Sequence, residues 1–120
     1  MGLFRRNKNI KKPVIRQIID LVPRWMIESC SKKHNSDKGC SKYKTYDQFV
    51  ALTYGQLNKC YTLNDISTGI GVSEIFIGDL GLNQSPARST MSDGNKKRDW
   101  KVFESLYYKV LNHYKRILKS

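Results

Sequence analysis

The spacing of large apolar residues near the C-terminus constrains the fold of this 120-residue chain more than any other feature. From Trp100 onward these residues recur every three or four positions, which is the period of one face of an α-helix. The pattern predicts a long amphipathic helix whose apolar face, with Phe103 and Tyr107 in it, closes a hydrophobic core. Its members are Trp100, Phe103, Leu106, Tyr107, Val110, Leu111, Tyr114, Ile117 and Leu118.

Two shorter helices are predicted near the N-terminus. Pro13 suits a first helical turn because the N–H that proline lacks is not needed there. The apolar residues of 14–22 then follow at helical spacing. Pro23 ends this helix and can begin a second one, whose weaker apolar stripe includes Trp25 and Cys30.

The middle of the chain shows two helix starts with the same capping pattern. Thr45 and Gln48 form a T-x-x-Q capping box, and Thr62 and Asp65 repeat the device as T-x-x-D. Gly55 in the first of these helices allows a neighbouring helix to pack closely. The two helices together predict an αα-hairpin.

The segment 72–84 has two interpretations. Ser73 can cap a short helix that ends at Gly81, whereas the apolar run 75–77 also suits a strand. The helix is preferred because no other segment of the chain pairs with such a strand.

These signals predict an all-α fold of five to six helices in one domain. The domain is expected to span residues 13–120, behind a basic, flexible arm at residues 1–12. The link from Thr62 to Ser85 exceeds the three- or four-residue turn of a tight helix-turn-helix. The fold is therefore expected to be an elaborated helix-turn-helix with an inserted element and a long C-terminal helix.

Cysteine use and hydropathy give expectations about compartment and cofactors. Cys30, His34 and Cys40 have the spacing C-x3-H-x5-C, but a structural zinc site needs four ligands, and Cys60 would be an isolated fourth. No metal or other cofactor is expected. With an odd number of cysteines and no secretory signal, free thiols in the cytoplasm are the simplest account. No apolar run approaches the ~20 residues of a membrane span.

The charge of the chain, net +12, is unevenly distributed. Residues 1–44 hold 12 basic and 3 acidic residues, and residues 83–120 hold 9 and 3. Residues 45–82, by contrast, hold 1 basic and 4 acidic residues. Such segregation favours a basic face for an anionic partner. The alternative is a basic protein without such a partner.

The stretch SPARSTMSDGNKKRDW (residues 85–100) gives the main functional signal. Ser85 and Pro86 are typical of an N-cap and a first helical turn, so a helix is expected to begin there with an N-terminus suited to phosphate. The alternative, a solvated surface helix, explains the serines but not the scarcity of acids, since Asp93 is the one acid within 84–97.

We predict that this helix reads the major groove of a DNA duplex. Arginine can bond guanine, asparagine can bond adenine, and serine or threonine can bond phosphates or base edges. Cations at the end of the helix would neutralise phosphates. The predicted DNA-binding residues are Ser85, Arg88, Ser89, Ser92, Asn95, Lys96, Lys97, Arg98, Lys42, Lys44 and Thr62.

Several short motifs, in their order and spacing, resemble a known family. They are Gly55-Gln56-Leu57, Leu63-Asn64-Asp65-Ile66, Leu80-Gly81-Leu82, and Arg88-Ser89-Thr90-Met91 continuing through Asn95, Arg98, Asp99 and Trp100. Over residues 10–120 the chain resembles the N-terminal domain of bacterial insertion-sequence transposases of the DDE class, of the insertion-sequence-four type. It departs at Gly94, where the family usually has alanine, and at Asn64, where a basic residue is frequent.

The resemblance implies sequence-specific binding to the terminal inverted repeats of a mobile element during transposition, by a cytoplasmic, nucleoid-associated bacterial protein. It also implies an RNase H-like catalytic core that follows this domain, in which two Asp and one Glu hold divalent metals. That core is expected to be absent from this chain. Asp20, Asp65 and Asp99 lie in or at the start of predicted helices, not in the expected strand. No catalytic residue is therefore assigned, and the chain is not expected to be an enzyme.

A second hypothesis belongs to another class of function. The regular spacing from Trp100 to Ile117 also suits a small helical interaction or regulatory protein that forms a homodimer through its C-terminal helix.

Overall fold

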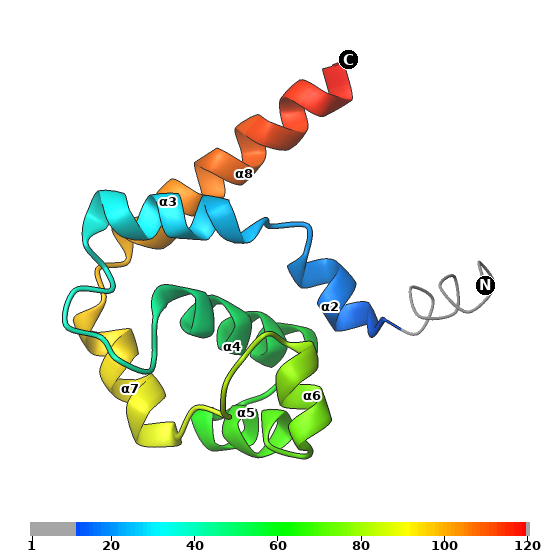
Figure 1. Cartoon of the computed structure of the whole chain (residues 1–120), viewed down its shortest axis with the longest axis vertical. Helices are drawn as coiled ribbons and strands as arrows, with labels where there is room; N and C mark the ends of the chain where they lie inside the picture. The colour runs from blue at the N-terminus through cyan, green and yellow to red at the C-terminus, as the bar shows by residue number, and fades with distance from the viewer. Residues whose placement is uncertain (1–11, 120) are drawn as a thin grey trace.

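The computed structural model describes residues 12–119, and all regular structure within that range is helical (Figure 1). This confirms the all-α class, with seven helices in the described range rather than five or six. The predicted arm lies, except for Lys12, outside the described residues. The helices are α2 (Val14–Ile19), α3 (Arg24–His34), α4 (Thr45–Leu57), α5 (Leu63–Ile70), α6 (Glu74–Asp79), α7 (Arg88–Lys97) and α8 (Lys101–Lys119).

Helix α4 is at the centre of the molecule and packs against α2, α3, α5 and α7. Helix α3 lies along the first part of α8, whereas the end of α8 extends away from the other helices (Figure 1). Helix α5 approaches α4 closely at Gly55, where a Cβ would lie 2.6 Å from Cδ1 of Ile66. The core includes the fully buried side chains of Met26, Val50 and Val102. Each side chain of this kind stabilises the fold by ~1.5–3 kcal/mol.

Two of the predicted helix caps are confirmed. The hydroxyl of Thr62 accepts a hydrogen bond from the backbone N–H of Asp65 (3.0 Å). The hydroxyl of Ser73 accepts one from the backbone N–H of Phe76 (3.0 Å) at the start of α6, so segment 72–84 forms the predicted helix rather than a strand. As expected, this helix is inserted between α5 and α7.

The start of α4 differs from the predicted capping box. Lys44 is the N-cap residue, and its backbone N–H donates to the carboxylate of Asp47 (2.9 Å). Thr45 instead donates to Asp37 through its backbone N–H (2.6 Å) and its hydroxyl (2.8 Å). Gln48 is buried and bonded to residues in and after α7. Both residues predicted to cap α4 thus make tertiary contacts.

The helix predicted to begin at Ser85 begins at Arg88. Ala87 is its N-cap residue, and no side chain caps it. Ser85 donates its hydroxyl to the backbone carbonyl of Ser67 in α5 (2.8 Å), and Pro86 is buried. The prediction that Ser85 caps this helix is therefore wrong, because its hydroxyl ties the preceding segment to α5.

Helix α8 closes the core mainly through its first turns. Val102 and Leu106 are buried, and Phe103 packs against the same core while remaining partly exposed. The prediction that Tyr107 lies in the core is wrong, since it is 61% exposed. Successive residues of a helix point about 100° apart, so Tyr107 turns away from the core that Leu106 enters. Leu118 lies on the extending end of α8 and is exposed.

Candidate nucleic-acid interface

One side of α7 faces the protein. Met91 is buried there, and Gly94 and Asn95 follow it at helical spacing. A Cβ on Gly94 would lie 2.7 Å from the ring of Tyr43. Glycine therefore lets that ring lie directly against α7, and the helix continues through Gly94 to its end at Lys97.

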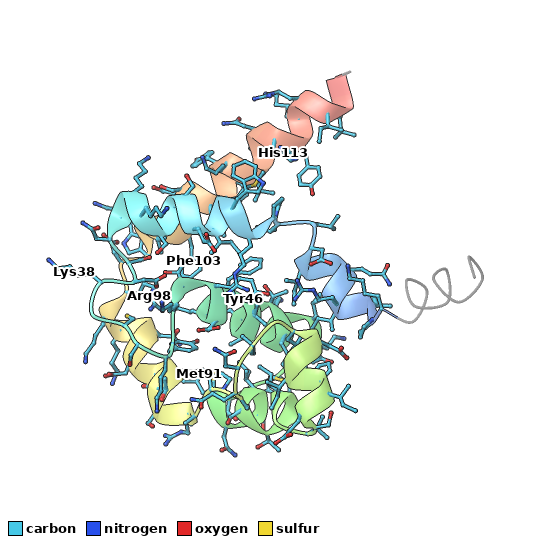
Figure 2. All side chains as sticks on the ribbon, in the orientation of Figure 1. Lys38, Tyr46, Met91, Arg98, Phe103 and His113 are labelled. Carbon is cyan, nitrogen blue, oxygen red and sulfur yellow. The ribbon has the colours of Figure 1, made fainter. Side chains whose placement is uncertain are left out.

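Arg98 follows α7 and is held inside the protein (Figure 2). Its side chain is only 3% exposed, and it lies 3.5 Å from the carboxylate of Asp37. The guanidinium donates to the amide oxygen of Gln48 (2.5 Å) and to the backbone carbonyls of Tyr43 (2.7 Å) and Ser36 (3.2 Å). The prediction that Arg98 contacts a DNA phosphate is therefore wrong: its donors fasten the end of α7 to the rest of the fold.

Asn95 is also bonded to the protein, although the residue remains exposed. Its Oδ1 accepts a hydrogen bond from Nε2 of Gln48 (2.8 Å). Recognition of adenine by asparagine uses both the oxygen and the nitrogen of the amide. While the bond to Gln48 holds, the oxygen of Asn95 is not offered to a base. Gln48 thus bonds both Asn95 and Arg98.

The opposite side of α7 faces solvent. Ser89, Asp93 and Lys96 lie along it, and Arg88 and Lys97 flank it, all exposed. Asp93 pairs with Lys97 one turn later (3.0 Å). An ion pair this exposed contributes little to stability, so Lys97 can exchange its partner for an external anion.

A hollow separates α7 from residues 35–44, which we call the 35–44 loop. It has a volume of about 520 Å³, and we call it the α7 hollow. Its exposed cationic lining residues are Lys38, Lys42 and Lys97, the buried side chain of Arg98 also lines it, and Asp93 and Asp99 are its acidic residues. Figure 2 shows Lys38 extending outward from the loop. The cations exceed the acids, which suits the hollow to the edge of a polyanion.

Tyr43 supports α7 beneath this hollow. Its ring is buried, and the Arg98 guanidinium carbon lies 5.7 Å from the ring centroid. Burial raises the pKa of the Tyr43 hydroxyl far above its usual range, although Arg98 acts in the opposite direction. The hydroxyl finds no hydrogen-bond partner among the described residues. It therefore stays neutral and holds α7 by packing rather than by charge.

The predicted site residues fall into two sets. Those turned toward the protein or used to cap a helix are Ser85, Asn95, Arg98 and Thr62. Those exposed on α7 or on the neighbouring loop are Arg88, Ser89, Lys96, Lys97, Lys42 and Lys44, and Ser92 on α7 is partly buried.

The α7 hollow is also lined by Lys38, which was not among the predicted DNA-binding residues. The basic composition of its loop was the available signal, but the proximity of that loop to α7 was not visible in the sequence.

Two structural expectations concern metals and membranes. Within residues 12–119, no group of three or more His, Cys, Asp and Glu side chains is arranged to hold a metal ion. Cys30, Cys40 and Cys60 are free thiols, as predicted. The helices of this range also include none with the length and apolarity to cross a bilayer.

A family model described as "Domain of unknown function (DUF4372)" matches residues 10–81. The match covers α2 to α6 and the 35–44 loop, which holds Arg98's partners Ser36 and Tyr43, and it ends ahead of α7. No curated protein and no solved structure matches the chain.

Proposed function

The chain belongs to the family described as a domain of unknown function (DUF4372), and we propose that it binds double-stranded DNA with sequence specificity. The observation that carries this proposal is the cationic surface formed by the outward side of α7 and the 35–44 loop. Arg88, Lys96 and Lys97 lie exposed on α7, and Lys38 and Lys42 lie on the loop beside it.

In this proposal the outward side of α7 enters the major groove. The small Ser89 allows the helix backbone to approach the base edges, and Arg88 reads a base through its guanidinium. No side chain caps α7, so its first backbone N–H groups can bond a phosphate. Lys96 and Lys97 bond phosphates on one side of the groove, and the lysines of the 35–44 loop bond those on the other.

The distribution of acids supports one orientation of the duplex. The acidic segment 45–82 forms α4, α5 and α6. Helix α6 lies across the molecule from α7 (Figure 1). The electrostatic field is therefore more positive on the α7 side than on the α6 side, and it turns the α7 side toward an approaching polyanion.

The biological role that we propose is recognition of the ends of a mobile element by a transposase, in the cytoplasm and nucleoid of a bacterium. The resemblance of the ordered motifs to insertion-sequence transposase N-terminal domains supports it. In this role the domain positions DNA and takes no part in the chemistry of cleavage or joining.

A selection of random duplexes by the full chain, run at low and at physiological salt, tests the function. We expect one sequence to be enriched at both salt concentrations, while total binding falls steeply as salt rises. Binding that enriches no sequence would leave only nonspecific attraction and would contradict the proposal.

A second candidate function rests on exposed apolar residues in α8 and at Trp100 just before it. Trp100, Tyr107, Leu111 and Leu118 are all exposed and are spaced by seven, four and seven residues. This is the spacing of a coiled-coil seam, which suits a homodimer of a helical interaction protein. Light scattering over a range of concentrations decides between the two. A stable dimer without DNA affinity at low salt would favour this candidate.

A further inference from the structure

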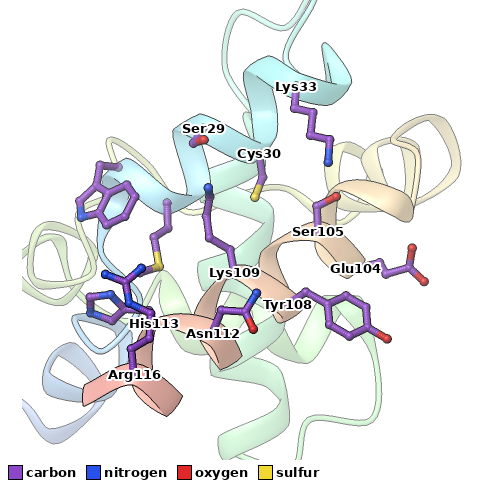
Figure 3. A pocket seen from close by; sticks show the side chains of 12 residues that line it. Ser29, Cys30, Lys33, Glu104, Ser105, Tyr108, Lys109, Asn112, His113 and Arg116 are labelled. Atoms are coloured by element: carbon purple, nitrogen blue, oxygen red, sulfur yellow. The ribbon is translucent and has the colours of Figure 1, made fainter. Parts of the chain in front are cut away.

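A second groove lies between α3 and α8 (Figure 3). It has a volume of about 600 Å³, and we call it the α3–α8 groove. Its charged lining residues are Lys33, Lys109 and Arg116, with Glu104 as the acid among them. The groove is therefore cationic, and none of the predicted DNA-binding residues lines it.

Two aromatic side chains line the same groove and face solvent. Trp25 is 57% exposed and Tyr108 is 55% exposed. The Nζ atom of Lys109 lies 6.0 Å from the centroid of the Trp25 ring, and His113 meets that ring edge-on at 6.4 Å. These neighbours position the indole while leaving more than half of the residue accessible.

The floor of the groove is apolar. Met26 and Cys30 line it and are buried. Burial raises the pKa of the Cys30 thiol, although the charges of Lys109 and Lys33 act to lower it. The thiol is therefore neutral, and the positive charge of the groove stays on the side chains around it (Figure 3).

We propose that the α3–α8 groove binds an unpaired strand of nucleic acid. Surfaces that bind single strands combine cations along the phosphate backbone with exposed aromatic rings on which bases stack. Lys33, Lys109 and Arg116 supply the cations, and Trp25 and Tyr108 supply the rings. A duplex would use the cations alone, because its bases are already stacked. The volume lies within the range of pockets that hold small ligands, so the groove has room for a nucleotide.

The groove adjoins the α7 hollow at the end of α3. Lys33 lines the groove, and its neighbour His34 lines the hollow. The Nε2 atom of His34 is hydrogen-bonded to the hydroxyl of Ser105, a groove residue (2.6 Å). A strand that separates from a duplex on α7 can therefore continue into the groove. The two sites have no lining residue in common, so this inference goes beyond the proposed function and does not depend on it.

The chain holds two tryptophans, which makes fluorescence a direct probe. In a full chain with Trp100→Phe, emission reports on Trp25. We expect a thymidine oligonucleotide of about ten nucleotides, within the range of known site sizes, to quench it. An abasic strand of the same length and charge should bind more weakly and quench less, because it offers phosphates without bases.

Trp25→Ala is the decisive variant, and Trp100→Ala is its matched control. Trp100 is 64% exposed but does not line the groove. We expect Trp25→Ala to weaken single-strand binding about fivefold to 150-fold, the usual effect of losing one stacking ring, and Trp100→Ala to leave it unchanged. Trp25→Phe keeps a ring and should retain part of the affinity. Circular dichroism confirms that each variant is folded.

Equal single-strand affinity of Trp25→Ala, Trp100→Ala and the original chain would overturn the inference. Equally tight binding of the abasic and thymidine strands would also overturn it, because attraction to phosphates would then suffice. Duplex binding separates the two proposals: Trp25→Ala should leave duplex affinity unchanged, whereas Arg88→Ala should lower duplex affinity and leave single-strand affinity unchanged.

Discussion

At the C-terminal end of α7, the side chains of two neighbouring cations, Lys97 and Arg98, differ in the same way as the outward and inward sides of the helix: one is exposed and the other is buried. The side chain of Lys97 is 75% exposed and pairs with Asp93 on the surface. The side chain of Arg98 is 3% exposed and reaches Asp37, Gln48 and two backbone carbonyls. One cation is available to an external anion, and the other belongs to the interior.

The difference follows from side-chain chemistry. Arginine carries five N–H donors in a rigid fork, so one buried guanidinium can satisfy several acceptors at once. Lysine keeps its charge in water at the end of a flexible stem. Asn95 and Arg98 thus hold α7 against α4 through their bonds to Gln48. Both belong to the motif by which the chain resembles the transposase family. In the proposed function, DNA is therefore bound by the residues on the outward side of α7.

The largest effect is expected from Arg98→Ala. Removing the guanidinium leaves Gln48 and two backbone carbonyls without their donor and Asp37 without its ion-pair partner, which should lower the free energy of unfolding by about 3 kcal/mol. Denaturation in urea measures this loss. Lys97→Ala is the adjacent control and should change stability by less than about 0.5 kcal/mol. Equal stability losses in the two variants would contradict the difference between a buried Arg98 side chain and an exposed Lys97 side chain.

Arg88→Ala should have the next largest effect, on recognition. We expect it to weaken binding to the selected duplex by about 1–3 kcal/mol and binding to random duplexes by less, because it removes the proposed base contact. Fluorescence anisotropy with both duplexes measures the difference. Stability should stay within about 0.5 kcal/mol of the original because Arg88 is exposed. An equal loss on both duplexes would show that Arg88 contacts only the backbone.

Gly94→Ala tests how closely α7 packs on Tyr43. The added Cβ would meet the Tyr43 ring, an overpacking cost of about 1–3 kcal/mol that exceeds the gain of about 1 kcal/mol in helix propensity. We expect thermal denaturation to show a net loss of about 1 kcal/mol. Gly78→Ala in α6 is the matched control, because nothing lies within 4 Å of its Cβ, and it should stabilise the protein. If Gly94→Ala stabilised the protein, α7 would be packed less tightly against Tyr43 than the structure indicates.

Lys97→Ala should have the smallest effect on binding. It removes one proposed phosphate contact, so affinity for selected and random duplexes should fall about equally, and the slope of log affinity against log salt should decrease by about one. Titrations over a series of salt concentrations measure the slope. An unchanged slope would place Lys97 outside the interface.

Local signals in the sequence were sufficient for part of this fold. Thr62 and Ser73 cap their helices through backbone groups three residues away, so the necessary information lies within one turn. The periodicity from Trp100 likewise predicts α8, since one face of a helix repeats along its length.

The rest depended on contacts between distant segments. Gln48 fits a capping box locally, but the fold places it beside Asn95 and Arg98, about 50 residues later. Ser85 fits an N-cap, but it bonds a carbonyl of α5. A polar residue that matches a local capping pattern can instead form its hydrogen bond with a residue that is distant in the sequence. A single sequence does not show which residue that is.

The central claim is that DNA meets the outward side of α7 together with the 35–44 loop. Backbone amide chemical shifts of the full chain, recorded by NMR during titration with the selected duplex, test it most directly. We predict the largest changes at residues 88–97 and 35–44, and little change in α6. Changes concentrated in α5 and α6, with α7 unaffected, would contradict the claim.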